Sequence, residues 1–137
     1  MSGFSKASSS IIIASYQYGS QTGNIATTSV PYWNGSNSNP AGLYRFTFQM
    51  EVTTAATVSS TLPSLVVTAY NRQNQQLTYT TATATGNTVT TFTTGGFAMD
   101  VRAGSLNDVT YATTGYLSTA AGMQYSLRFT VEYLGNV

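Results

Sequence analysis

Few residues of this chain could carry out acid–base chemistry. The acidic residues are Glu51, Asp100, Asp108 and Glu132. A glycosidase site needs two carboxyl groups that face each other across a cleft. Glu51 and Glu132 instead fall on the polar faces of two long expected strands. On those faces each can form a cross-strand ion pair with Arg45 or Arg128, which is the ordinary role of such residues in a sheet.

The sequence does not support nucleophilic catalysis or metal binding either. The chain has no histidine and no cysteine, so a Ser-His-Asp triad, thiol chemistry and disulfides are excluded. The only lysine, Lys6, lies in an expected N-terminal arm. Asp100 and Asp108 lack the closely spaced oxygen ligands of a calcium site, and Gly95-Gly96 is a doublet, not a phosphate-binding loop. We therefore predict no enzyme activity, no catalytic residue, no metal and no cofactor.

Charged residues are scarce in this chain. Asp, Glu, Lys and Arg make up 7% of the residues, against about 25% in an ordinary domain. No basic run is present, so neither nucleic acid nor a membrane surface is expected as a partner. The apolar run 11–14 is too short for a signal peptide, and no stretch approaches a membrane span. We expect synthesis in the cytoplasm without export by the general route.

The polar positions are filled by threonine and serine where most domains have charges. Hydrophobic residues make up 42% of the chain, with ten tyrosines and six phenylalanines, a content that disordered chains lack. Threonine is β-branched and suits a pleated surface. A surface with a net charge of only +1 gives little repulsion between copies. The composition therefore predicts a folded β-domain that packs against copies of itself.

Two long segments alternate apolar and polar residues with a period of two. In residues 43–52, one face carries Tyr44, Phe46, Phe48, Met50 and Val52. In residues 123–133, one face carries Met123, Tyr125, Leu127, Phe129, Val131 and Tyr133. This period is typical of half-buried antiparallel strands. We expect these two strands to anchor the core.

Shorter strands are expected between the long ones. They cover residues 65–70, 76–80, 88–92, 97–101 and 109–113, with a hairpin loop at 71–75. Before the first long strand, a further strand is expected across residues 24–33, interrupted by Pro31. Strands and turns at intervals of 8–12 residues are typical of a sandwich or barrel, and no segment has helical periodicity. The predicted fold is an all-β antiparallel sandwich with an N-terminal arm. Residues 1–20 form the arm or an added strand, and residues 21–137 form one domain.

Four of the aromatic residues outside the two core strands are candidates for contacts with a ligand or another subunit. They are Tyr16, Tyr18, Tyr32 and Trp33. Tyrosine and tryptophan are enriched in binding surfaces and can stack on sugars. The more frequent alternative is that they pack at a subunit interface or at the edge of the sandwich, because most aromatic residues are buried. These four are the candidate ligand or interface residues.

Three short motifs resemble those of jelly-roll trimers of the tumour-necrosis-factor and complement type. They are Gly42-Leu-Tyr44-Arg-Phe46, Arg102-Ala-Gly104-Ser, and the alternating strand from Tyr125 to Tyr133. Residues 51–68 and 110–116 are similar to small structural proteins of tailed phages, many of which are virion surface proteins. The resemblance covers roughly residues 40–137. It implies a jelly-roll-like sandwich, a homotrimer and no enzyme activity.

The resemblance implies a protein of a virus particle, assembled in the host cytoplasm and exposed on the particle surface. We expect a capsid decoration or cement protein whose partners are copies of itself and the major capsid protein or another virion protein. Two alternatives stay open. One is a host-recognition knob or carbohydrate-binding module at a fibre tip, with Tyr32 and Trp33 at the sugar site. The other is a subunit of an extracellular filament or surface layer.

Overall fold

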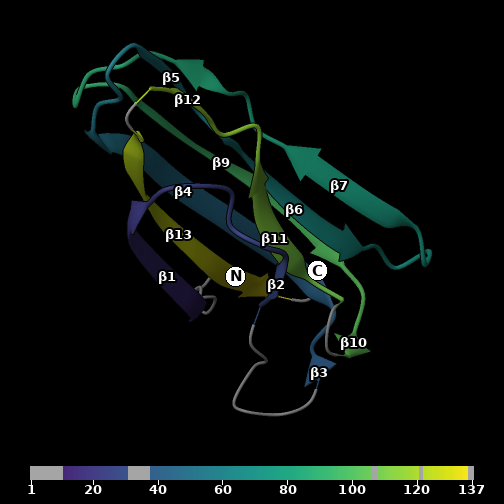
Figure 1. Ribbon diagram of the computed structural model, residues 1–137. Helices are drawn as coiled ribbons and strands as arrows, with labels where there is room; N and C mark the ends of the chain where they lie inside the picture. Colours follow the sequence, from purple (N-terminus) through teal and green to yellow (C-terminus); the bar gives the residue numbers. More distant parts are fainter. Residues whose placement is uncertain (1–10, 31–37, 106–107, 121, 136–137) are drawn as a thin grey trace.

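Two antiparallel four-stranded sheets form the body of the computed structural model (Figure 1). In sheet A the order is β1 (Ile11–Gln21), β13 (Gln124–Gly135), β4 (Gly42–Thr54) and β9 (Phe92–Val101). In sheet B the order is β2 (Thr28–Ser29), β11 (Thr110–Thr114), β6 (Ser64–Tyr70) and β7 (Gln76–Thr80). The structure describes residues 11–30, 38–105, 108–120 and 122–135.

Two smaller sheets complete the described strands. One has the order β12 (Leu117–Thr119), β5 (Ser59–Leu62) and β8 (Ala84–Thr85). The other pairs β10 (Gly104–Ser105) with β3 (Ser38–Asn39). The described residues contain no helix, and hence none that is long and apolar enough to span a membrane.

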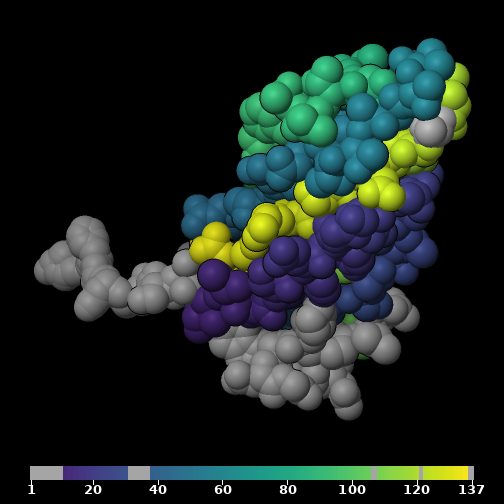
Figure 2. Space-filling model, turned by 60° about the vertical axis from the view of Figure 1, so that its left-hand side comes forward, coloured from purple at the N-terminus to yellow at the C-terminus, as the bar shows by residue number. Residues whose placement is uncertain are grey.

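The strand order identifies the sandwich as a jelly roll. In chain order, sheet A takes the first, eighth, third and sixth of the eight strands in the two large sheets, and sheet B takes the second, seventh, fourth and fifth. This alternation between two sheets is the arrangement of a double Greek-key jelly roll. The predicted fold class is confirmed. Figure 2 shows sheet A from outside, with purple β1, yellow β13 and blue β4 as neighbouring bands.

The two long strands of the sequence pattern pair in the middle of sheet A. β4 and β13 are antiparallel, and Phe48 lies opposite Phe129. Their apolar faces point into the sandwich and are almost fully buried, as in Phe46, Met50 and Leu127. Sheet B covers them with its own inward residues, chiefly Leu65, Val67 and Tyr111. Burial of these side chains is the main force that holds the two sheets together.

Residues 11–20 of the expected N-terminal arm belong to β1. This strand pairs with β13 along most of its length, and Ala14 and Tyr16 on its inner side belong to the core or pack against it. The register shifts twice, between Ile12 and Ala14 and between Tyr18 and Gln21. Residues 1–10 lie outside the described part of the chain.

The boundaries of β9 and β2 differ from the expected ones. Residues 88–91, expected as the start of a strand, form a turn in which the Thr91 amide donates to the Thr88 carbonyl at 2.9 Å. The Thr88 hydroxyl also bonds the hydroxyls of Thr90 and Thr91, and such local bonds compete with strand pairing. β9 therefore begins at Phe92. Of the strand expected across residues 24–33, only β2 is present in the described residues.

Candidate functional site

Tyr16 and Tyr18 lie on the inner side of β1, where both contact Tyr111 of sheet B. The Tyr16 ring centre is 4.7 Å from that of Tyr111 and 5.9 Å from that of Phe129. The hydroxyls of Tyr18 and Tyr111 are hydrogen-bonded to each other. Burial, and secondarily the neighbouring Tyr18, raise the pKa of Tyr16 to about 12. Both rings are thus engaged with the interior of the sandwich.

Tyr32 and Trp33, the other two aromatic candidates, lie outside the described residues. Their predicted role in ligand or interface contacts stays a prediction. Of the four candidate residues, Tyr16 and Tyr18 lie together on the inner side of β1.

Three of the four acidic residues form ion pairs. Arg45 pairs with Glu132 across strands at 3.1 Å, Arg72 with Asp100 at 2.9 Å, and Arg102 with Asp108 at 2.9 Å. The Arg102 guanidinium also lies 4.4 Å from the ring centre of Tyr70. Within the described ranges, no three residues of the types that bind metals come together. These carboxylates hold loops and strands in place.

The side of the sandwich formed by β7 and β9, here called the open edge, is the most exposed part of the two large sheets. β7 is the last strand of sheet B and β9 is the last strand of sheet A. All five residues of β7 are exposed. In β9 only Val101, at its end, is buried. The inner faces of the two sheets are therefore accessible along this side.

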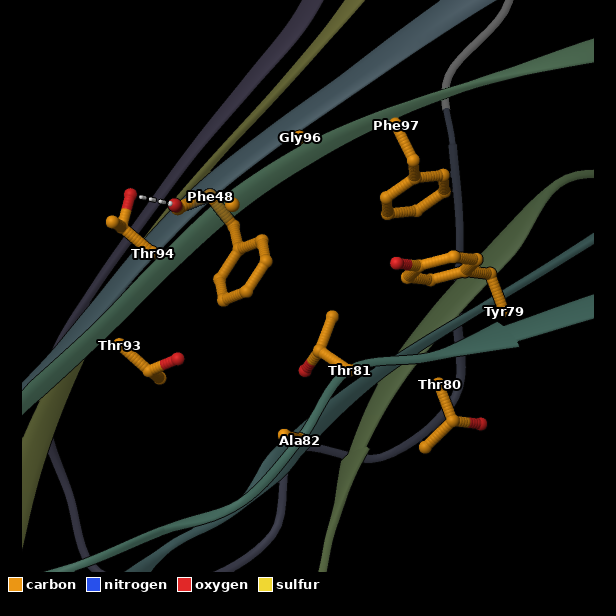
Figure 3. Close-up of a pocket in the computed structure, with 10 residues that line it drawn as sticks. Phe48, Tyr79, Thr80, Thr81, Ala82, Thr93, Thr94, Gly96 and Phe97 are labelled. Atoms are coloured by element: carbon orange, nitrogen blue, oxygen red, sulfur yellow. Dashed lines mark hydrogen bonds between the residues drawn. The ribbon is translucent and has the colours of Figure 1, made fainter.

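A cavity of about 230 Å³ lies between the two strands of the open edge (Figure 3). Phe48 forms one wall and Tyr79 and Phe97 another, with threonine residues around the rim. The Tyr79 and Phe97 rings are stacked, with centres 4.0 Å apart and planes 16° apart. This stack connects β7 to β9. Tyr79 points inward yet is 45% exposed, because no further strand covers it.

Two glycines of β9 shape the surface on either side of sheet A. A Cβ atom on Gly95 would lie 3.0 Å from the Phe48 ring, on the inner side. A Cβ atom on Gly96 would lie 3.1 Å from the Thr47 methyl group, on the outer side. The absence of side chains here leaves a shallow groove of about 390 Å³ on the outer face, bordered by Thr47, Gln49, Thr94, Arg128 and Thr130.

The open edge carries no charged residue over a long stretch of chain. Residues 73–99, which include β7, β8 and nearly all of β9, contain no Asp, Glu, Lys or Arg. Leu77, Tyr79, Val89 and Phe92 of this stretch are large hydrophobic residues with substantial exposure. Most natural edge strands are protected by charges, proline or bulges. The open edge has the composition of a surface that another molecule covers.

The sequence interpretation missed the open edge as a candidate site. It treated residues 76–80 and 97–101 as ordinary strands and placed the binding candidates at Tyr16, Tyr18, Tyr32 and Trp33. The available signal was the absence of charge from residue 73 to residue 99, since a soluble surface usually mixes charges of both signs.

Comparison with known proteins leaves the family of the chain open. No family model and no curated protein matches the chain. The structure of infectious bursal disease virus, Gx strain, is similar with 14% identity and a TM-score of 0.44, over 94% of this chain and 32% of that one.

A second solved structure is the CBM22-1–GH10 portion of Clostridium thermocellum xylanase 10B bound to xylohexaose. It is similar with 13% identity and a TM-score of 0.41, over 93% of this chain and 29% of that one. The chain spans about a third of the length of either solved structure. The assignment of the jelly roll rests on this chain's own strand order.

Proposed function

We propose that the protein is a non-enzymatic structural subunit that acts through contacts with copies of itself and with other proteins. The observation that carries this proposal is the open edge. It combines two edge strands, exposed apolar side chains and a stretch without charge on one side of the sandwich. Interfaces between subunits are depleted of charged residues and enriched in tyrosine and phenylalanine at their centres.

The arrangement of the acidic residues supports a non-catalytic role. Glu132, Asp100 and Asp108 are each bonded to an arginine from a neighbouring strand or loop. A carboxylate in such a pair contributes orientation and modest stability. The side chains near the cavity of the open edge are aromatic, threonine and glycine residues, which suit packing and hydrogen bonding better than proton transfer.

The more specific proposal is a decoration or cement protein on the surface of a virus particle. Jelly rolls are frequent in viral capsid proteins, although the same fold also occurs in lectins and other proteins. A decoration protein needs a stable body and one or more surfaces that pack against other subunits. The jelly roll provides the first and the open edge provides the second.

Light scattering on the purified protein tests the structural-subunit proposal. We expect a mass greater than that of one 14.5 kDa chain, rising with concentration to a plateau. A mass of one chain at every concentration would contradict the proposal.

The virion role is tested separately by sedimenting the labelled protein with virus particles from the same source. Saturable co-sedimentation would support it, and protein that stays in the supernatant would count against it.

A further inference from the structure

We propose that two copies of the chain pair through β9, antiparallel and about a two-fold axis at Thr94, so that Phe92 of each copy covers Gly96 of the other. This inference rests on the proposed function, because it specifies the contact through which copies associate. It joins two copies of sheet A into one continuous sheet.

β9 is a regular edge strand. Its ten residues pair with β4 without a register shift, from Gly42 opposite Val101 to Glu51 opposite Phe92. The other edge of sheet A, β1, is interrupted by two register shifts, which is a common way to prevent pairing with another chain. β9 contains neither proline nor lysine. Among the described strands, β9 is therefore the longest edge suited to receive another strand.

The backbone N–H and C=O groups of alternate residues in β9 point away from β4. The Val52 amide donates to the Thr91 carbonyl at 3.0 Å, so the odd-numbered residues of β9 exchange hydrogen bonds with β4. In an antiparallel ladder the bonding residues alternate with residues whose N–H and C=O groups point to the opposite side. Phe92, Thr94 and Gly96 thus direct their backbone groups away from β4, where the described strands place no neighbour.

Side chains on the outer face of sheet A fit this pairing. The side chain of Phe92 is on that face because Phe92 lies opposite Glu51, and it is 59% exposed. The groove over Gly96 lies on the same face. Phe92 and Gly96 are each two residues from Thr94, so a two-fold axis at Thr94 brings each Phe92 over the groove of the other copy. An aromatic ring across from an edge glycine is a favourable cross-strand pair.

The absence of charge near Thr94 favours a second copy of the chain as the partner of β9. Two-fold symmetry brings each residue near its own neighbours in the other copy, so any charge at the centre would meet a like charge. Residues 73–99 carry no charge, and this penalty does not arise. The nearest charge of β9, Asp100, is already paired with Arg72 at 2.9 Å. It lies away from the paired residues 92–96.

A single cysteine in this cysteine-free chain tests the geometry directly. Opposed Cα atoms of a hydrogen-bonded antiparallel pair are about 5.5 Å apart, which is within reach of a disulfide. Under mild oxidation we expect Thr94→Cys to give a disulfide-linked dimer. Gln17→Cys, exposed on the outer face at the other edge of sheet A, should remain monomeric on a denaturing gel. Equal cross-linking of the two variants would overturn the inference.

Removal of the Phe92 ring tests the fit. Phe92→Ala should weaken self-association at least about tenfold by sedimentation equilibrium, with an unchanged thermal unfolding midpoint of the monomer. Ile12→Ala is the matched control, because Ile12 is 62% exposed and lies at the opposite edge; it should associate as the unmodified protein does. An oligomer that is unaffected by Phe92→Ala, or that has strictly three chains, would refute β9 pairing and leave the structural-subunit proposal standing. A monomeric unmodified protein would refute both.

Discussion

Gly42 begins β4 at a point where the chain cannot accept a side chain. Its φ angle is +153°, and a Cβ atom there would lie 2.5 Å from Cε1 of Tyr133 and 2.6 Å from the carbonyl oxygen of Gly135. Both the conformation and the close approach favour glycine. The same residue opens the Gly-x-Tyr-x-Phe motif of the sequence, so this motif has a steric basis in the sandwich.

Gly42→Ala should lower the free energy of unfolding by about 1–3 kcal/mol, which is typical of overpacking. Urea denaturation measures this change. Gly23→Ala is the control, since no atom lies within 4 Å of the Cβ position at Gly23. Equal stability of the two variants would show that the start of β4 can accommodate a side chain, and would contradict the prediction.

The buried tyrosines make stability sensitive to alkaline pH. Tyr44 is 1% exposed and donates its hydroxyl hydrogen to the Pro40 carbonyl at 2.6 Å. Chiefly through burial, its pKa is raised from 10.0 to about 12. A raised pKa means that the folded protein holds this proton more tightly than the unfolded chain does.

The contribution of Tyr44 is therefore complete below pH 10 and is lost as the pH rises to about 12. Over this window the free energy of unfolding should fall by about 1.4 kcal/mol per pH unit for this residue. Urea titrations across the window measure the slope, and Tyr44→Phe should make it shallower by about that amount. An identical slope in both proteins would show that folding does not raise the pKa of Tyr44.

At the scale of elements, Asn87 ties the small sheet at one end of the sandwich together. Its side-chain oxygen accepts hydrogen bonds from the Ala56 amide at 2.7 Å and the Ser60 hydroxyl at 2.8 Å. Its side-chain nitrogen donates to the Ala56 carbonyl at 2.8 Å. Ala56 is buried, so its amide and carbonyl depend on Asn87 for their bonds. The Ser60 hydroxyl can also donate to the Gly86 carbonyl, at 2.9 Å.

Asn87→Ala should lower the free energy of unfolding by about 1–3 kcal/mol, because it leaves buried polar groups without partners. Asn87→Asp keeps the acceptor oxygen but sets a negatively charged oxygen against the Ala56 carbonyl, so it should also destabilise the fold. Thermal or urea unfolding of the two variants measures both losses. A loss below about 0.5 kcal/mol for Asn87→Ala, as for an ordinary surface substitution, would contradict the assigned bonding.

The strands predicted most accurately from the sequence are those in which apolar and polar residues alternate regularly. β4 and β13 carry a continuous apolar face, and both form where expected. The strands β5, β8 and β12 were not expected, since they lack such a face. They depend on side-chain bonds such as those of Asn87. These bonds join residues far apart in the chain, and local periodicity does not reveal them.

At the scale of the whole molecule, the strand order decides which residues are exposed. Leu77 and Tyr79 follow the alternation of an ordinary strand, and only their place at the end of sheet B leaves them open to solvent. Edge position depends on long-range pairing, so the open edge could not be located from sequence. The absence of charged residues from 73 to 99 could have been noted from the sequence. The sandwich was predicted from the spacing of strands and turns, and self-association, expected from the composition, stays a prediction.

We propose that copies of the chain associate through the open edge. Sedimentation velocity of Thr94→Lys tests it most directly, because this change places two like charges beside each other at the proposed axis. Gln17→Lys adds the same charge at the opposite edge. We expect the unmodified protein and Gln17→Lys to sediment as dimers, and Thr94→Lys to sediment as a single 14.5 kDa chain. A Thr94→Lys variant that associates as strongly as the unmodified protein would contradict the account.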